Sequence, residues 1–125
     1  MPDDAQVQII LGSLLGDGRI EGGAGERQMR IVHALERERY VWWKYERLIP
    51  LSQEPPCVSG TRIGFATIAH PLFDDLASLI GAPRGRTRIM RELLGPLGLA
   101  IWMSDTGRLE LRADLFVPRM RAFAA

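Results

Sequence analysis

The sequence predicts a single α+β domain over residues 1–125. Apolar segments with helical spacing alternate with pairs of short segments in which apolar and polar residues alternate, as in half-buried strands. The expected order is helix, two strands, helix, two strands, two helices and a strand, which is typical of α+β folds. A third observation is that the start of the chain, an apolar helix followed by a polar residue, Gly and a strand, recurs around residues 97–107.

The first helix is expected over residues 5–16, where apolar side chains occupy enough positions for burial on most sides. Asp17 and Gly18 end this helix, because Gly readily adopts the positive φ of a helix C-terminus. Two strands are expected at 19–21 and 27–34, and the glycine-rich stretch between them is a turn signal.

The second helix is expected over residues 36–49, where Tyr40 and Trp43 share a face, and the prolines that follow end it. Residues 57–68 fit a second pair of short strands with a turn at Gly60. The rest of the chain is expected to form a helix at 71–80 that begins with Pro71, a loop at 81–87, a short helical turn at 89–94, a helix at 97–107 and a strand at 108–113.

The composition indicates a water-soluble protein with an arginine-rich basic set. The net charge is +1, and of the 16 basic residues every one except Lys44 is Arg. The planar guanidinium suits phosphates and guanine edges, although a base-composition bias of the genome gives the same count. The near-neutral total means that a nucleic-acid surface must be local.

Targeting and redox signals are sparse. The single Cys57 forms no internal disulfide, so a reducing, cytoplasmic location is expected. Asp3 and Asp4 near the start argue against a secretory signal. No apolar run approaches the ~20 residues of a membrane span, so no membrane partner is expected. No dinucleotide fingerprint is present, and no small-molecule cofactor is expected.

Gly12 and Gly16 lie four residues apart on one face of the first helix, where Gly is otherwise unfavourable. Their missing side chains predict a seam at which another helix backbone approaches closely. The partner is either the second apolar run or a copy of the first. Either arrangement gathers carboxylates at the helix ends, where like charges repel unless a cation neutralises them. Mg²⁺ is such a cation, because it takes oxygen ligands and substrate phosphates.

Two apolar segments share a similar pattern, ILGSLLGDG (10–18) and LAIWMSDTG (99–107). Both resemble the signature helices of LAGLIDADG homing endonucleases. Three further segments resemble other parts of the same family in the right order: 38–48 its second helix, 65–80 its strand-to-helix segment and 91–102 the lead-in to its second signature. Each signature alone is weak, but the ordered set, which covers roughly residues 7–112, is specific.

The resemblance implies an αββαββα unit with a curved antiparallel sheet that binds double-stranded DNA. It also implies double-strand cleavage, with Mg²⁺ shared between the signature helices, and a link to the mobility of introns or inteins. Asp17 occupies the penultimate acidic position of the first signature. Asp17 and Asp105 are therefore the expected catalytic residues and metal ligands, while Gly12 and Gly16 are seam residues.

Two departures from the family pattern affect the expected activity. The acidic position of the second signature holds Thr106, so Asp105 is the only acid there. After Gly107 only a short tail follows, so the second half is expected to be truncated. A homodimer that pairs the first helix with its copy would restore two acids and two sheets. Alternatively, cleavage is lost, or Asp105 becomes a substitute ligand.

The DNA contacts are expected from the strands and from one arginine-rich loop, with solvated surface as the alternative for each residue. The predicted DNA-binding residues are Arg19, Gln28, Arg30 and Arg62 on the strands, and Arg84, Arg86 and Arg88 in the loop. His33 and His70 lack metal-ligand spacing and are expected to be structural, as are the tryptophans.

The leading hypothesis from the sequence is a Mg²⁺-dependent, sequence-specific DNA endonuclease that acts as a homodimer. In that mechanism Asp17 binds the metal and the arginines hold the duplex. A DNA-binding protein of the same fold that does not cleave is the main alternative, and Thr106 favours it. A small interaction protein without a DNA role is a third possibility.

Overall fold

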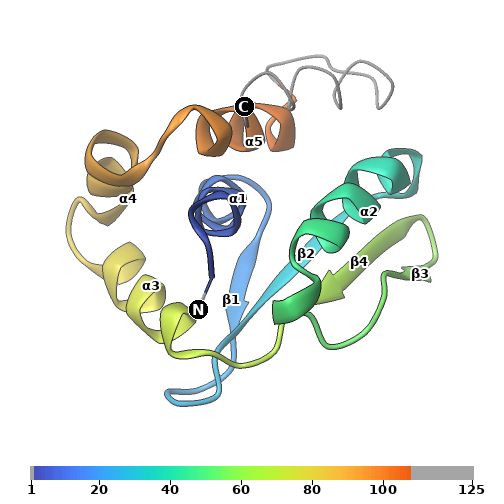
Figure 1. The fold of residues 1–125 in the computed structure, drawn as a ribbon, viewed down its shortest axis with the longest axis horizontal. Helices are drawn as coiled ribbons and strands as arrows, with labels where there is room; N and C mark the ends of the chain where they lie inside the picture. The colour runs from blue at the N-terminus through green and yellow to red at the C-terminus, as the bar shows by residue number, and fades with distance from the viewer. Residues whose placement is uncertain (1, 108–125) are drawn as a thin grey trace.

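The computed structural model describes residues 2–107 and combines one antiparallel sheet with helices packed on one of its faces (Figure 1). Its elements are α1 (Asp4–Leu15), β1 (Arg19–Glu21), β2 (Gln28–Ala34), a 3₁₀ turn (Leu35–Arg37), α2 (Glu38–Arg47), a 3₁₀ turn (Ile49–Leu51), β3 (Cys57–Ser59), β4 (Arg62–Ala66), α3 (Pro71–Gly81), α4 (Gly85–Arg88), a π-helical turn (Ile89–Leu93) and α5 (Pro96–Asp105). The predicted α+β class and αββαββα order are confirmed. The strand predicted at 108–113 lies outside the described residues.

The four strands form a sheet in the order β1-β2-β4-β3, and every neighbouring pair is antiparallel. Arg19 of β1 lies opposite Arg30 of β2, and Ala34 of β2 lies opposite Arg62 of β4. Side chains alternate between the two faces of a strand. The inner face of the sheet is therefore mostly apolar but includes His33, whereas these three arginines share the outer face.

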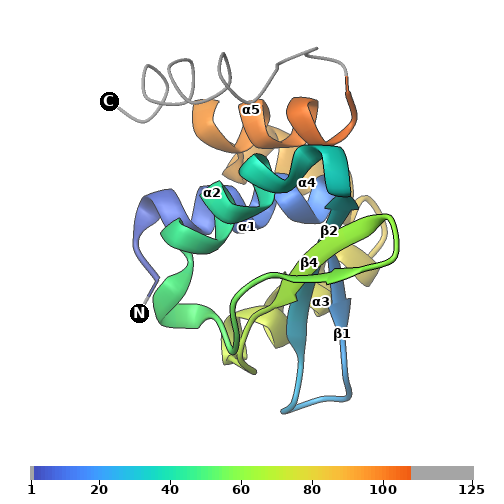
Figure 2. The same cartoon turned by 90° about the vertical axis from the view of Figure 1, so that its right-hand side faces the viewer.

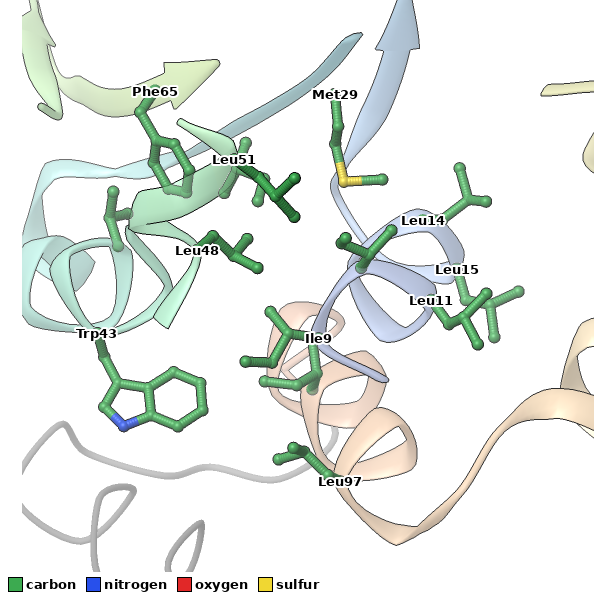
Figure 3. Packing of buried hydrophobic residues seen from close by; sticks show 14 of the residues in the cluster. Ile9, Leu11, Leu14, Leu15, Met29, Trp43, Leu48, Leu51, Phe65 and Leu97 are labelled. Atoms are coloured by element: carbon green, nitrogen blue, oxygen red, sulfur yellow. The ribbon is translucent and has the colours of Figure 1, made fainter. Parts of the chain in front are cut away.

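Helix α1 runs through the middle of the molecule (Figure 1, Figure 2). Asp3 caps its start, because the Asp3 side chain accepts from the Gln6 N–H and the Gln6 side chain accepts from the Asp3 N–H. The next two turns are buried from Ile9 to Leu15, as the apolar run predicts. Figure 3 shows Ile9 of α1 and Met29 of β2 pointing into the same apolar interior.

Helix α5 packs along α1, and glycines in both helices allow the two backbones to approach closely. A Cβ added at Gly12 would lie 2.6 Å from the Ile101 Cβ, and one added at Gly98 of α5 would lie 2.5 Å from the Gln8 side-chain oxygen. Real side chains do not tolerate such distances, so the two helices touch because both lack side chains at the crossing. The sequence left two possible partners for the first helix. In the described chain the partner of α1 is α5, which is the second apolar run.

The segment between α3 and α5 is more helical than expected. Residues 81–87 were predicted as a loop, but α4 begins at Gly85 and continues into the π-helical turn. A Cβ at Gly85 would lie 2.9 Å from the Leu79 carbonyl carbon, so this chain reversal depends on glycine. None of the helices described is both long and apolar enough to cross a membrane.

Candidate functional site

The C-terminal ends of α1 and α5 bring Asp17 and Asp105 together. The backbone N–H of Asp17 donates a hydrogen bond of 3.0 Å to Oδ2 of Asp105. A Cβ added at Gly16 would lie 2.6 Å from that same oxygen. Gly16 therefore leaves the space that the Asp105 side chain fills, and the helix seam positions the two acids as neighbours.

The two carboxylates have opposite surroundings. The Asp17 side chain is 50% exposed, whereas the Asp105 side chain is 0% exposed. Partial burial and the nearby charge of Asp105 raise the pKa of Asp17. Burial alone would raise the pKa of Asp105 too, but the attraction of Lys44 and His33 and the hydrogen bonds from Lys44 and Tyr40 lower it.

Three groups hold the Asp105 carboxylate in addition to His33. Oδ1 accepts from Lys44 Nζ at 2.8 Å and from the Tyr40 hydroxyl, while Oδ2 accepts from the Asp17 N–H. Lys44 is fully buried, and burial lowers its pKa although Asp105 opposes this shift. Tyr40 has a raised pKa because it is buried beside the Asp105 charge, so it remains a hydrogen-bond donor.

His33 connects the two acids from the inner face of β2. Its Nδ1 lies 3.4 Å from Asp17 Oδ2, and its Nε2 lies 3.3 Å from Lys44 Nζ. Burial and the Lys44 charge lower the pKa of His33 to about 3, so the ring is neutral near pH 7. A neutral ring with its proton on Nδ1 donates toward Asp17 and accepts from Lys44.

A hollow of about 420 Å³ opens between the end of α1 and the outer face of the sheet. Asp17 lies at one side of it, and the arginines come from three different strands. The lining residues are Gly16, Asp17, Gly18, Arg19, Glu21, Arg30, Val32 and Arg62. Arg30 is held by Glu21 at 3.0 Å. This surface places the Asp17 carboxylate beside several cationic groups that can bind phosphate, and its other carboxylate, Glu21, is paired with Arg30.

The three arginines of the predicted loop lie on α4 or just before it, and none of them is among the residues that line the hollow. Arg86 Nη2 donates to the Leu15 carbonyl at 2.9 Å and so reaches the C-terminal end of α1. Arg88 pairs with Glu92 at 3.0 Å on an exposed surface. Arg84 adopts a left-handed conformation with φ 58° just before α4. Arg86 thus ties α4 to the helix that ends just before Asp17.

Comparisons with known proteins agree with this arrangement of helices and sheet. The model of the LAGLIDADG DNA endonuclease family matches residues 7–118. The chain belongs to the LAGLIDADG DNA endonuclease family. The RecA protein of Mycobacterium gastri is 31% identical over 119 residues, which is 88% of this chain and 28% of that protein. RecA of Mycolicibacterium flavescens is 30% identical over 118 residues, which is 88% of this chain and 27% of that protein.

This LAGLIDADG chain thus spans little more than a quarter of the length of these curated relatives. Among solved structures, the homing endonuclease I-WcaI bound to its DNA recognition sequence matches with a TM-score of 0.66. The match has 17% sequence identity and covers 84% of this chain and 52% of that one. At this identity the match supports the LAGLIDADG fold.

In the second LAGLIDADG signature the acid lies one residue earlier than in the first. When the two signatures are aligned, Gly16 corresponds to Asp105 and Asp17 corresponds to Thr106. One residue turns a helix by about 100°. The Asp105 carboxylate therefore points into the seam and meets α2, while Thr106 is exposed and its hydroxyl donates to the Met103 carbonyl at 3.1 Å.

The site residues that the sequence did not reveal are Tyr40, Lys44 and His33 of this LAGLIDADG domain. Tyr40 and Lys44 are four residues apart, so they share one face of α2. The single lysine of the chain, between apolar and aromatic residues in VWWKY, was the available signal. For His33 the signal was strand alternation, which places it on the inner face with Met29 and Ile31.

Asp17 could contribute its carboxylate to a divalent-cation site. Mg²⁺, as one example, is often bound by one or two carboxylates together with substrate phosphates. Asp17 is exposed enough to contribute, but both oxygens of Asp105 already accept hydrogen bonds from the protein. Within residues 2–107, no three His, Cys, Asp or Glu side chains are grouped so that they could hold a metal ion. The metal-ligand role expected for Asp105 stays a prediction, and the hydrogen bonds of its carboxylate come from within the protein.

Proposed function

We propose that this protein is a DNA endonuclease that binds a duplex on the outer face of its sheet and hydrolyses a phosphodiester bond beside Asp17. The observation that carries the proposal is the position of Asp17. Its half-exposed carboxylate lies at the side of the hollow lined by Arg19, Arg30 and Arg62. A phosphate held by these arginines comes close to the carboxylate that can bind a divalent cation.

The chain's own residues supply binding and orientation. The strand arginines neutralise phosphates, and Gln28 lies on the same face, where its amide can contact a base edge. His33, which is neutral, holds the Asp17 carboxylate through Nδ1. Bound at Asp17, Mg²⁺ supplies Lewis-acid chemistry and offsets charge on the phosphate. The resulting reaction is water-dependent cleavage of one phosphodiester bond.

Cleavage of a plasmid library in Mg²⁺ tests this function. Asp17→Asn is expected to abolish cleavage and to leave DNA binding nearly unchanged, because the arginines remain. Asp75→Asn is a matched control, since Asp75 is exposed on α3 away from the site. Cleavage by Asp17→Asn at the wild-type rate would rule out the assigned role of Asp17.

A DNA-binding protein that does not cleave is the second candidate, and the position of Asp105 favours it. Both oxygens of Asp105 are occupied within the protein, so the second signature offers no free acid. Binding that weakens steeply with salt, without cleavage in Mg²⁺ or Mn²⁺, would support this candidate, because phosphate contacts release counterions.

The homodimer expected from the sequence stays a prediction, as does a role in intron or intein mobility. In the described chain, α5 covers the face of α1 that carries Gly12 and Gly16. Two α1 helices could pair through that face only if α5 moved away. The mass in solution, measured by light scattering with and without DNA, tests whether two copies assemble.

A further inference from the structure

The buried ammonium group of Lys44 is an unusual component of the site. Its side chain is 0% exposed, and Nζ lies 2.8 Å from Asp105 Oδ1. Moving an ammonium group out of water costs several kcal/mol unless close partners compensate for it. Here the partners are the Asp105 carboxylate, the ring nitrogen of His33 at 3.3 Å and the Tyr40 ring, whose centroid is 4.6 Å from Nζ.

The location of this ammonium group matters as much as its burial. Asp105 lies at the end of the helix seam, and its Oδ2 accepts from the backbone N–H of Asp17. Two carboxylates at such a junction repel each other unless a cation lies between or beside them. In this chain the cation is part of the protein, because Lys44 reaches the junction from α2.

We propose that Lys44 is a resident cation that takes the place of a divalent ion at Asp105 and leaves the site with one metal position, at Asp17. The inference deepens the proposed function and rests on it for the role of Asp17. Lys44 then acts through Asp105: it fixes the carboxylate that orients the Asp17 backbone, and it is a positioning residue.

Two features separate this role from an ordinary buried ion pair. First, Lys44 is linked to both acids, to Asp105 directly and to Asp17 through His33. Second, Asp105 has no other cationic partner within hydrogen-bond distance among the described residues. Removal of the lysine charge therefore creates an acidic junction that a divalent ion can fill, whereas removal of an ordinary ion-pair partner leaves a site that no metal rescues.

Thermal unfolding of Lys44→Met with and without Mg²⁺ tests the proposal directly. The substitution removes the ammonium group and keeps an unbranched apolar chain. We expect a lower Tm in EDTA, and recovery of roughly 5 °C or more in millimolar MgCl₂ at constant ionic strength. The wild-type Tm should shift by less, because Asp17 alone binds the ion weakly without phosphate. Equal Mg²⁺ shifts for both proteins would overturn the proposal.

Two control variants make the result specific to charge. Asp105→Asn leaves Lys44 without its anion, so it should be destabilised and should gain nothing extra from Mg²⁺. The double variant K44M/D105N removes both charges and should fold without metal. If K44M/D105N folds but K44M stays unfolded even in Mg²⁺ or Mn²⁺, a metal ion cannot replace the lysine and the proposal is wrong.

A count of bound Mn²⁺ by electron paramagnetic resonance gives a second, activity-independent measurement on the wild-type protein. One weak position that is lost in Asp17→Asn is expected, and two positions in the wild type would overturn the inference. The proposed function can fail separately. If Mg²⁺ restores the Tm of K44M but the wild-type protein does not cleave DNA, the role of Lys44 is kept and the nuclease function is rejected.

Discussion

The two signature helices have similar sequences but end in different environments. At the end of α1, Asp17 is half-exposed, faces arginines and has a raised pKa. At the end of α5, Asp105 is buried, bonded to Lys44 and Tyr40, and has a lowered pKa. The comparison teaches that a shift of one residue along a helix turns a half-exposed carboxylate into a buried, hydrogen-bonded one.

The same asymmetry extends along the helices. Ile10 of α1 is buried, whereas Leu99, its counterpart in α5, is 43% exposed. Helix α1 is enclosed by the sheet, α3, α4 and α5, while α5 lies at the outside of the described molecule (Figure 1, Figure 2). The helix that is enclosed carries the accessible acid, and the helix at the outside carries the sequestered one.

The seam between the helices is the feature on which both ends depend, and Gly12→Ala should have the largest effect. The added methyl group would lie 2.6 Å from the Ile101 Cβ and would force the helices apart. We expect a loss of about 4 kcal/mol or more in the free energy of unfolding, measured by urea denaturation. Gly23→Ala is the control, because nothing lies within 4 Å of the added atom.

Much of the fold was predictable because it follows from local periodicity. Alternation in β2 identified the outward position of Arg30 and the inward position of Ile31, and the spacing of Gly12 and Gly16 indicated a helix seam. The α+β class and the order of elements followed from the same patterns. Residues 81–87 were the exception, since the reversal before α4 depends on the contact of Gly85 with Leu79.

The network around Asp105 was less predictable because it depends on how α2 meets α5. The sequence showed that Thr106 replaces an acid, but it did not show where Asp105 would point. Lys44 and Asp105 are far apart in the chain, and their contact is set by the helix crossing. A single lysine in an apolar helix is a weak signal until its partner is known.

Asparagine substitutions at the two acids test the comparison most directly. Asp105→Asn leaves the Lys44 charge buried without its anion, so a loss of about 3–5 kcal/mol in unfolding free energy is expected. Asp17→Asn should change stability by less than about 0.5 kcal/mol, because the side chain is half-exposed and repelled by Asp105. Equal losses, measured in the same urea titration, would show that the two acids have equivalent roles.

The pH dependence of stability tests His33, which links the two ends. The folded pKa is about 3 against a usual 6.5, so between these values the unfolded chain binds more protons. Stability from His33 is therefore complete above pH 6.5 and falls as the pH decreases. At pH 5 the loss relative to pH 7 should be about 2 kcal/mol.

Urea titrations of the wild type and His33→Gln at both pH values isolate this contribution. The amide keeps a donor and an acceptor but does not titrate, so the variant should show a shallower decrease between pH 7 and pH 5. His70→Asn serves as the control, because asparagine can still cap α3 as the His70 ring does. If the unfolding free energy of His33→Gln falls as much between pH 7 and pH 5 as that of the wild type, His33 is already charged at pH 5 in the folded protein.

The smallest expected effect concerns the basic groups on the two sides of α1. Arg62→Ala should weaken DNA binding by about 1 kcal/mol and lower the salt dependence by about one counterion, because Arg62 lines the hollow beside Asp17. Arg88→Ala should have little effect, since Arg88 is paired with Glu92 away from that surface. Fluorescence anisotropy with a labelled duplex at several salt concentrations measures the affinity and its salt dependence for both variants. If Arg88→Ala weakens binding more than Arg62→Ala, the duplex contacts α4 instead of the outer face of the sheet. Asp17 would then not lie beside the bound phosphate.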